Sequence, residues 1–301
     1  MDNIEKIKKL KEEKNAIILA HYYVDEEVQK IADYIGDSFY LAKVASQTEA
    51  DRIVFAGVEF MGESAKILNP NKKVLMPDAF ADCPMAHMIT IKEIKEMREK
   101  YDDLAVVCYI NSTAEIKQYA DVCVTSSNAV KIVKALPQKN IFFIPDQNLG
   151  DFVRRQVPEK NVMTNYGHCP RHTNITLDKL NEAKQKYPEA KIAVHPECKR
   201  EIVEAADFVG STSAIIDYVV QTNAKDFIIG TVDGVFAKIK ELAPNKNLHT
   251  IMDVQVCSNM KKVTLEKIVD VLENDTNEVI LNDDFMQKAL SPLKKMLELA
   301  K

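Results

Sequence analysis

Three cysteines recur at a nearly constant interval, and together they could hold a metal centre. Cys83, Cys169 and Cys257 lie about 87 residues apart, and a threonine follows each of them at the seventh place. Each threonine opens a run of apolar residues at helical spacing. Because self-similarity at a fixed period indicates repeated structural units, the three thiols are expected at equivalent places in three similar units.

Converging thiolates suit either zinc or an iron–sulfur cluster. His87 and His172 stand close to two of the cysteines in the sequence, and zinc sites use Cys-x-x-His spacing. Cys257, however, is followed by Ser258 and has no neighbouring histidine, so the repeated element is sulfur alone. A cubane cluster held by three cysteines would leave one iron free to bind a substrate as a Lewis acid.

Polar side chains also mark the ends of predicted strands in each unit. They are His21, Tyr109 and His195 after the first strand, and Ser38, Ser126 and Thr212 after the second. Ligands of open parallel sheets bind at the carboxyl ends of strands, so these groups could meet in one cavity. The alternative is structural, because hydroxyl side chains cap helices and buried histidines are often hydrogen-bonded core residues. Capping and anion binding are compatible at a helix N-terminus.

The elements that would carry these groups alternate between strand and helix. The run 16–20 is continuously apolar, as expected for a strand buried on both faces. The first unit is predicted to contain helices at 3–14, 25–34, 38–47 and 59–68, and strands at 16–20, 34–36, 52–56 and 72–76. Ser38 is expected to cap the third of these helices. The alternation predicts an α/β fold with parallel sheets and right-handed crossovers.

The period divides the chain into three αβα units, at 1–84, 85–170 and 171–258. Residues 259–301 are predicted to add a helix, a strand at 279–281 and a last helix bent at Pro292, and so to complete the first sheet. Units related by a pseudo-threefold axis would bring their strand ends and the three cysteines to one central active site.

Composition bounds the function. A formal net charge of −5 over 301 residues argues against a general nucleic-acid surface but leaves room for a small anionic ligand. The first residues lack the apolar core of a signal peptide, and the apolar runs are too short to span a bilayer. The expected compartment is therefore the cytoplasm, where six cysteines would be reduced. Cys108 and Cys123 have no periodic counterparts and are expected to be small buried apolar groups.

The combined motifs resemble those of quinolinate synthase, an iron–sulfur enzyme family of de novo NAD biosynthesis. The resemblance runs nearly end to end. It rests on Leu19-Ala20-His21-Tyr22-Tyr23, Ile35-Gly36-Asp37-Ser38, Tyr109-Ile110-Asn111-Ser112-Thr113, Gly167-His168-Cys169, Val194-His195-Pro196-Glu197-Cys198 and Val209-Gly210-Ser211-Thr212. It implies three similar αβα domains around a central active site. It also implies condensation of iminoaspartate with dihydroxyacetone phosphate to quinolinate, with release of phosphate and water.

The resemblance also implies the site residues and a cofactor. A [4Fe–4S] cluster would be ligated by Cys83, Cys169 and Cys257. The implied substrate-binding residues are His21, Asp37, Ser38, Tyr109, Asn111, Ser126, His195, Glu197, Ser211 and Thr212. Closing a pyridine ring requires several proton transfers, which could be shared among His21, Tyr23, Tyr109 and Glu197. A functional link to an L-aspartate oxidase or dehydrogenase, and no membrane or nucleic-acid partner, would follow.

Two rival interpretations remain open from the sequence. A related enzyme with a three-cysteine cluster could reduce an allylic hydroxyl of an isoprenoid diphosphate, which would require an electron donor. A protein of a different class would be a non-enzymatic zinc protein or a redox sensor. Iron, sulfide and zinc content separate a cluster from zinc, and independence from an electron donor separates the two enzymes.

Overall fold

The computed structural model describes residues 2–301, which fold into three four-stranded parallel sheets. The first sheet contains β1 (Ala16–His21), β2 (Tyr34–Gly36), β3 (Arg52–Ala56) and β4 (Lys73–Leu75). The second contains β5 (Leu104–Tyr109), β6 (Val122–Val124), β7 (Asn140–Ile144) and β8 (Asn161–Thr164). The third contains β9 (Lys191–Val194), β10 (Phe208–Val209), β11 (Asp226–Gly230) and β12 (Asn247–Thr250). The α/β prediction with three repeated units is confirmed.

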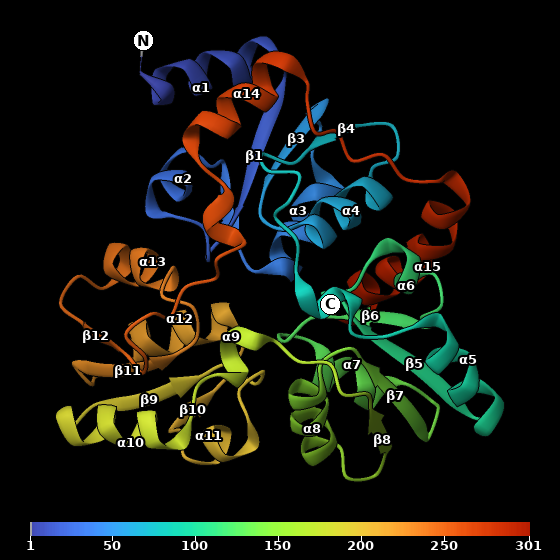
Figure 1. Cartoon of the computed structure of the whole chain (residues 1–301), viewed down its shortest axis with the longest axis vertical. Helices are drawn as coiled ribbons and strands as arrows, with labels where there is room; N and C mark the ends of the chain where they lie inside the picture. Colours follow the sequence, from blue (N-terminus) through green and yellow to red (C-terminus); the bar gives the residue numbers. More distant parts are fainter. Residues whose placement is uncertain (1) are drawn as a thin grey trace.

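The three sheets share one topology. Their strand orders are β2-β1-β3-β4, β6-β5-β7-β8 and β10-β9-β11-β12, so that the first strand of each unit lies between the second and the third. Figure 1 shows the sheets, each with helices beside it, as three lobes around the middle of the molecule. Because all strands of a sheet are parallel, their carboxyl ends lie at one edge.

Helices connect the strands within each unit. The first unit contains α1 (Asn3–Glu13), α2 (Glu26–Ile31), α3 (Ser38–Gln47) and α4 (Glu59–Leu68). The second contains α5 (Ile91–Lys100), α6 (Ala114–Lys117), α7 (Ala129–Ala135) and α8 (Gln147–Gln156). The third contains α9 (Pro170–Thr173), α10 (Leu177–Lys186), α11 (Arg200–Glu204), α12 (Thr212–Gln221) and α13 (Val235–Leu242). Two more helices, α14 (Leu265–Asn274) and α15 (Asp283–Leu299), end the chain.

One recurrent aspartate gives the repeat a structural cause. In each unit an aspartate just before the second strand accepts a hydrogen bond from a backbone N–H of the first strand, at 2.7 to 2.8 Å. The three pairs are Asp33 with Ile18, Asp121 with Val106, and Asp207 with Ile192. The carboxylate thereby links the segment before the second strand to the first strand, most of whose residues are buried.

The helix caps differ from the prediction. Asp37, not Ser38, is the N-cap of α3, since its carboxylate accepts from the backbone N–H of Tyr40 at 2.9 Å. Ser211 likewise caps α12, and Thr212 is the first helical residue. In the second unit Asn128 occupies the N-cap position of α7, two residues after Ser126. The three hydroxyl residues are therefore not the caps of these helices.

The C-terminal segment departs from the expected strand. Residues 279–281 form no strand; only an isolated antiparallel bridge joins Glu278 to Leu75, with Val279 N–H donating to Val74. Helix α14 packs against α1 and β3, whereas α15 contacts β6 and α6 of the second unit as well as α4. Helix α15 runs through Pro292 as one assigned helix. The two C-terminal helices therefore pack against both the first and the second unit.

The apolar core follows the same division. One continuous cluster fills the first two units and includes residues of α14 and α15, whereas two smaller clusters lie in the third unit. Polar contacts join the third unit to the first, for example Ser213 to Asp37 at 2.7 Å and Gln29 to the carbonyl of Gly234 at 3.0 Å. Among the described residues, none of the helices combines the length and apolar character needed to cross a membrane.

Candidate active site

The strand ends of all three units meet at one cavity of about 860 Å³, part of which is open to solvent. Of the residues implied by the sequence, His21, Tyr23, Asp37, Ser38, Cys83, Tyr109, Asn111, Ser126, Cys169, His195, Glu197, Thr212 and Cys257 line it. Ser211 serves instead as the cap of α12, with its hydroxyl accepting from the N–H of Ala214 at 3.3 Å. The parallel topology causes this convergence, because it directs each polar strand end to the same side.

Strand geometry places the first group of side chains. His21 is the last residue of β1, Tyr109 is the last residue of β5, and His195 directly follows β9. Ser38 and Thr212 are the first residues of the ten-residue helices α3 and α12, where backbone N–H groups are left without helical partners. The cavity wall therefore combines neutral donors with two helix N-termini, which suits anionic ligands.

The three periodic cysteines line the same cavity as free, half-buried thiols. Burial, together with the neighbouring charges of Glu197 and Cys257, raises the pKa of Cys83 to about 12. Burial, Glu197 and Cys83 likewise raise the pKa of Cys169. Thiols that oppose one another's ionisation need a metal cation to become thiolates together. Three sulfur ligands from three units are a donor set that fits a cluster.

Two carboxylates fix the backbone of the cysteine loops. The fully buried side chain of Asp146 accepts hydrogen bonds from the N–H of Leu149 at 2.7 Å and from the N–H of Cys169 at 3.0 Å. Asp82 accepts from the N–H of Cys83 at 2.6 Å. Asp146 thus both caps α8 and holds the backbone of the second cysteine.

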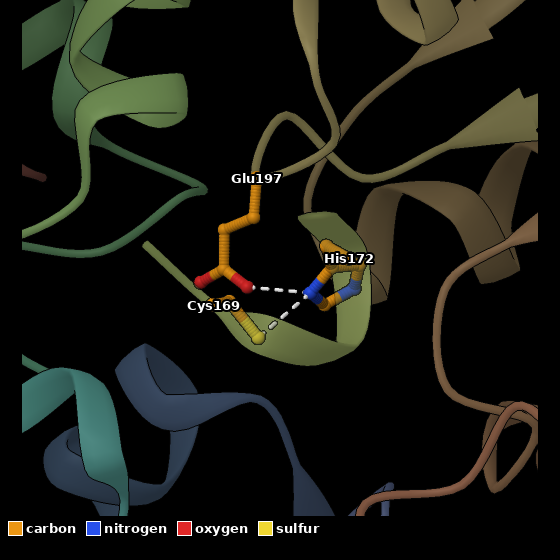
Figure 2. Close-up of side chains that lie close together, drawn as sticks. All are labelled: Cys169, His172 and Glu197. Carbon is orange, nitrogen blue, oxygen red and sulfur yellow. Dashed lines mark hydrogen bonds and ion pairs between the residues drawn. The ribbon is translucent and has the colours of Figure 1, made fainter. Parts of the chain in front are cut away.

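Glu197 is the centre of the polar network. Its Oε1 accepts a hydrogen bond of 2.6 Å from the hydroxyl of Tyr109, and its Oε2 lies 2.7 Å from Nδ1 of His172 (Figure 2). Burial opposes ionisation of this carboxyl, but the nearby imidazoles and these donors outweigh it and hold the pKa of Glu197 below its usual range. Glu197 is therefore an anion that accepts hydrogen bonds from two units.

The two predicted histidines are neutral donors. Burial lowers the pKa of His21 and of His195 to about 3. Nδ1 of His21 accepts from the backbone N–H of Tyr23 at 3.2 Å, and Nδ1 of His195 accepts from that of Glu197 at 3.3 Å. In each neutral ring the proton must then sit on Nε2. Both histidines can donate a hydrogen bond without bringing a charge.

Asn111 and Asp37 differ in how their polar atoms are used. The buried Oδ1 of Asn111 has no hydrogen-bond partner within the described chain, so it is an acceptor available to a ligand. Both carboxylate oxygens of Asp37 are occupied, one by Tyr40 N–H and the other by the hydroxyl of Ser213 at 2.7 Å. Asp37 therefore lines the cavity mainly as a link between the first and third units.

Sequence reasoning did not assign to the substrate site two cavity residues that follow the second cysteine. His172 is buried, with Nδ1 3.2 Å from the sulfur of Cys169, and Arg171 contributes a cation to the cavity wall. The Cys-x-x-His spacing was the available signal for His172, but it indicated zinc rather than a contact with Glu197. His87, the other histidine of that interpretation, lies outside the cavity lining and pairs with Asp82 at 2.7 Å.

The ligand atoms of Cys169, His172 and Glu197 lie within 4.8 Å of one another (Figure 2). A sulfur, an imidazole nitrogen and a carboxylate oxygen at this spacing could bind one divalent ion such as zinc. The cavity thus contains two overlapping donor sets that share Cys169. They are separable, because only the cluster needs Cys83 and Cys257.

Comparisons with known proteins agree with this geometry. A family model described as Quinolinate synthetase A protein matches residues 5–298. A protein of Fusobacterium nucleatum named Quinolinate synthase is 58% identical over 296 residues, which cover 98% of this chain and 99% of that protein. Proteins with the same name from Sulfurihydrogenibium sp. and Caldicellulosiruptor saccharolyticus are 52% and 49% identical, with at least 98% of each chain covered.

Proposed function

The chain belongs to the quinolinate synthetase A family of enzymes, and we propose that it condenses iminoaspartate with dihydroxyacetone phosphate to quinolinate for NAD biosynthesis. The observation that carries the proposal is the convergence of three thiols, two neutral histidines and one buried carboxylate on a single cavity. The products are quinolinate, phosphate and two waters. The site must therefore bind anions and move several protons.

Anion binding falls to groups of the cavity wall. Ser38 and Thr212 start α3 and α12 and neither hydroxyl caps its helix, but Oγ1 of Thr212 also lies 2.9 Å from the hydroxyl of Tyr23. Together with Ser126, they are suited to the phosphate and carboxylate groups of the two substrates. Arg171 adds a positive charge at the wall, and Asn111 offers an unpartnered carbonyl oxygen to a substrate hydroxyl or imine N–H.

Proton transfer is assigned to Glu197 and to the tyrosines Tyr23 and Tyr109. Glu197 is ionised and accepts from Tyr109, so a substrate proton taken by the phenol oxygen can be matched by release of the phenol proton to the carboxylate. His21 and His195 hold N–H donors that can stabilise a substrate carbonyl or a departing hydroxyl. Burial of these groups excludes water that would compete for the same hydrogen bonds.

Cys83, Cys169 and Cys257 would hold a [4Fe–4S] cluster. When bound, such a cluster supplies a Lewis acid at the iron that has no cysteine ligand. The donor set supports this assignment over zinc, since all three cysteines of the repeat line one cavity while His87 does not. Iminoaspartate would be supplied by an L-aspartate oxidase or dehydrogenase.

An anaerobic reconstitution tests this function. The purified protein is mixed with dihydroxyacetone phosphate and with iminoaspartate generated in place from aspartate, without any electron donor, and quinolinate is measured by mass spectrometry. Quinolinate formation that requires both substrates supports the proposal. Absence of quinolinate from protein that carries its full iron and sulfide would refute it.

A further inference from the structure

Two polar side chains occupy the same place of the repeat, and both are buried. Gln29 stands eight places after His21, the end of β1, and Lys117 stands eight places after Tyr109, the end of β5. The exposed fraction is 4% for Gln29 and 0% for Lys117. Lysine is seldom fully buried, because removing an ammonium from water costs free energy that its partners must offset. The partners of these two side chains therefore indicate what they do.

The ammonium of Lys117 links the second unit to the first. Its Nζ donates to the carbonyl of Ser112, in the loop between β5 and α6, and lies 3.4 Å from the carbonyl of Phe60 in α4. Nζ also lies 5.5 Å from the centre of the Phe60 ring, which adds a cation–π contact. Burial raises the pKa of Glu63, also on α4, and the charge of Lys117 opposes that rise. The ammonium is thus held by groups of both units.

Gln29 makes the same kind of link between the first unit and the third. Its Nε2 lies 3.0 Å and 3.1 Å from the carbonyls of Tyr22 and Val24, in the loop after β1, and 3.0 Å from the carbonyl of Gly234 at the start of α13. Phe60 and Gly234 are equivalent, because each stands four places after the end of the third strand of its unit. Each donor therefore joins the loop after its own first strand to the start of the corresponding helix in a neighbouring unit.

The third pair of units keeps this link but exchanges the donor and the acceptor. The place eight residues after His195 holds Val203, which has no polar side chain. Asn148 stands four places after the end of β7, as Phe60 does after β3, and it donates instead. Its Nδ2 lies 3.0 Å from the carbonyl of Glu197, in the loop after β9. All three pairs of units are therefore joined by a hydrogen bond at this place of the repeat.

The three links support the loops in which the copies of the repeat differ chemically. These loops carry Tyr23, Asn111 and Glu197, and all three residues line the cavity. In each loop the bound carbonyl belongs to that residue or to one directly next to it. The three donors, by contrast, are not among the described residues that line the cavity. Their effect on the cavity must therefore pass through the loops.

We propose that Gln29, Lys117 and Asn148 are positioning residues that fix the active-site loops against neighbouring units, and that Lys117 thereby holds Asn111 where it binds substrate. The inference rests on the proposed function, in which Asn111 accepts a hydrogen bond from a substrate. The buried Oδ1 of Asn111 has no partner within residues 2–301, so no other protein contact holds it in place. Loss of the ammonium releases Ser112, and with it the loop, from α4.

The test compares Lys117→Met with Lys160→Met in anaerobically purified holoenzyme of equal iron and sulfide content. Methionine keeps much of the length of lysine without its charge and donors. Lys160 is the matched control, because it also donates to two backbone carbonyls of the second unit, those of Leu136 and Gln138, but does not line the cavity. We expect Lys117→Met to raise about fivefold the KM of the substrate whose KM Asn111→Ala raises, with kcat little changed. Lys160→Met should leave both constants unchanged.

Two further variants separate positioning from a general loss of structure. If Lys117 acts through Asn111, then Lys117→Met combined with Asn111→Ala raises that KM no more than Asn111→Ala alone. Asn148→Leu releases the backbone of Glu197 instead, so it should lower kcat about tenfold and leave that KM little changed. If Lys117→Met does not fold, the kcat of Asn148→Leu decides.

The outcomes distinguish this inference from the function on which it rests. An unchanged KM in folded Lys117→Met, additive effects in the double variant, or no effect of Asn111→Ala on either KM would overturn the proposal while quinolinate formation by the wild type stood. Wild-type kcat in Asn148→Leu, or an equal rise of KM in Lys160→Met, would overturn it as well. A fully loaded wild type that forms no quinolinate would refute the proposed function and this inference with it.

Discussion

The hydroxyl of Tyr109 donates a hydrogen bond of 2.6 Å to Oε1 of Glu197, and this bond joins the second unit to the third across the cavity. The two residues stand at related places of the repeat, where Tyr109 ends β5 and Glu197 follows β9 by three residues. The shared topology of the two units carries both strand ends to the cavity. The chemistry arises because their side chains differ, a phenol facing a carboxylate.

Replacement of Glu197 should therefore affect turnover more than binding. Glu197→Gln removes the anion that accepts from Tyr109 and His172, and the amide presents an N–H to one of those two donors. We expect kcat to fall by about 10²- to 10⁴-fold, with the cluster and the binding of a quinolinate-like ligand retained. Anaerobic turnover and ligand titration measure both. Glu201→Gln, on α11, is the control, and near wild-type turnover in Glu197→Gln would remove Glu197 from the mechanism.

The capping positions give a second prediction with an internal control. Ser38→Ala should raise the KM of an anionic substrate and leave the free energy of unfolding nearly unchanged, because Asp37 caps α3. Ser211→Ala should do the reverse and cost about 1 kcal/mol of stability, because Ser211 is the cap of α12. Denaturant unfolding and steady-state kinetics check the pair. Equal effects of both substitutions on KM would contradict this division.

The sequence located the main elements well where periodicity decides them. Strand β3, which is mostly buried, and helix α4, which has apolar residues at helical spacing, occupy the predicted residues, and so does the short, partly exposed strand β2. The caps were displaced by one residue at α3 and α12, because aspartate and serine both form caps and only the backbone decides between neighbours. Residues 279–281 have strand-like composition, yet that part of the chain shows only one bridge, at Glu278.

The candidate site was predictable to the extent that the repeat marks it. The three cysteines and the strand ends recur, so one unit predicts the others. His172 and Thr231 have no counterpart at the same place in every unit, and their contacts link segments that are distant in the chain. Side-chain contacts of this kind depend on how the units pack, which no local pattern encodes.

The buried histidines predict a dependence of stability on pH. The folded-state pKa of His21 and of His195 is about 3, below the unfolded value of 6.5, so the unfolded chain binds more protons between these values. Their stabilising effect is complete above pH 6.5 and is lost as the pH falls towards 3. The free energy of unfolding should therefore decrease by about 1.4 kcal/mol per pH unit for each histidine.

Urea unfolding at a series of pH values under anaerobic conditions measures this slope. His21→Asn should remove the contribution of one histidine to this slope. A wild-type stability that stays constant from pH 6.5 to 5 would show that the two buried rings do not resist protonation.

Arg171 should contribute to substrate capture. It adds a cation to the cavity wall, and the proposed substrates are anions. We expect Arg171→Gln to raise the KM of dihydroxyacetone phosphate about fivefold, and added salt to weaken wild-type binding more than binding by this variant. Arg154→Gln, in which the lost charge pairs with Asp151 on α8, is the matched control. A KM unchanged by Arg171→Gln would place this cation outside the substrate path.

The central claim is that the repeat brings Cys83, Cys169 and Cys257 to one iron–sulfur cluster. The most direct test is the iron, sulfide and zinc content of anaerobically purified single serine variants. Serine at any of these three positions should abolish the brown absorption of the cluster. Serine at Cys108 or Cys123, which are paired in register on β5 and β6 and fully buried, should retain it. Full iron and sulfide in Cys257→Ser, or zinc that persists in Cys83→Ser but is lost in His172→Asn, would contradict the account.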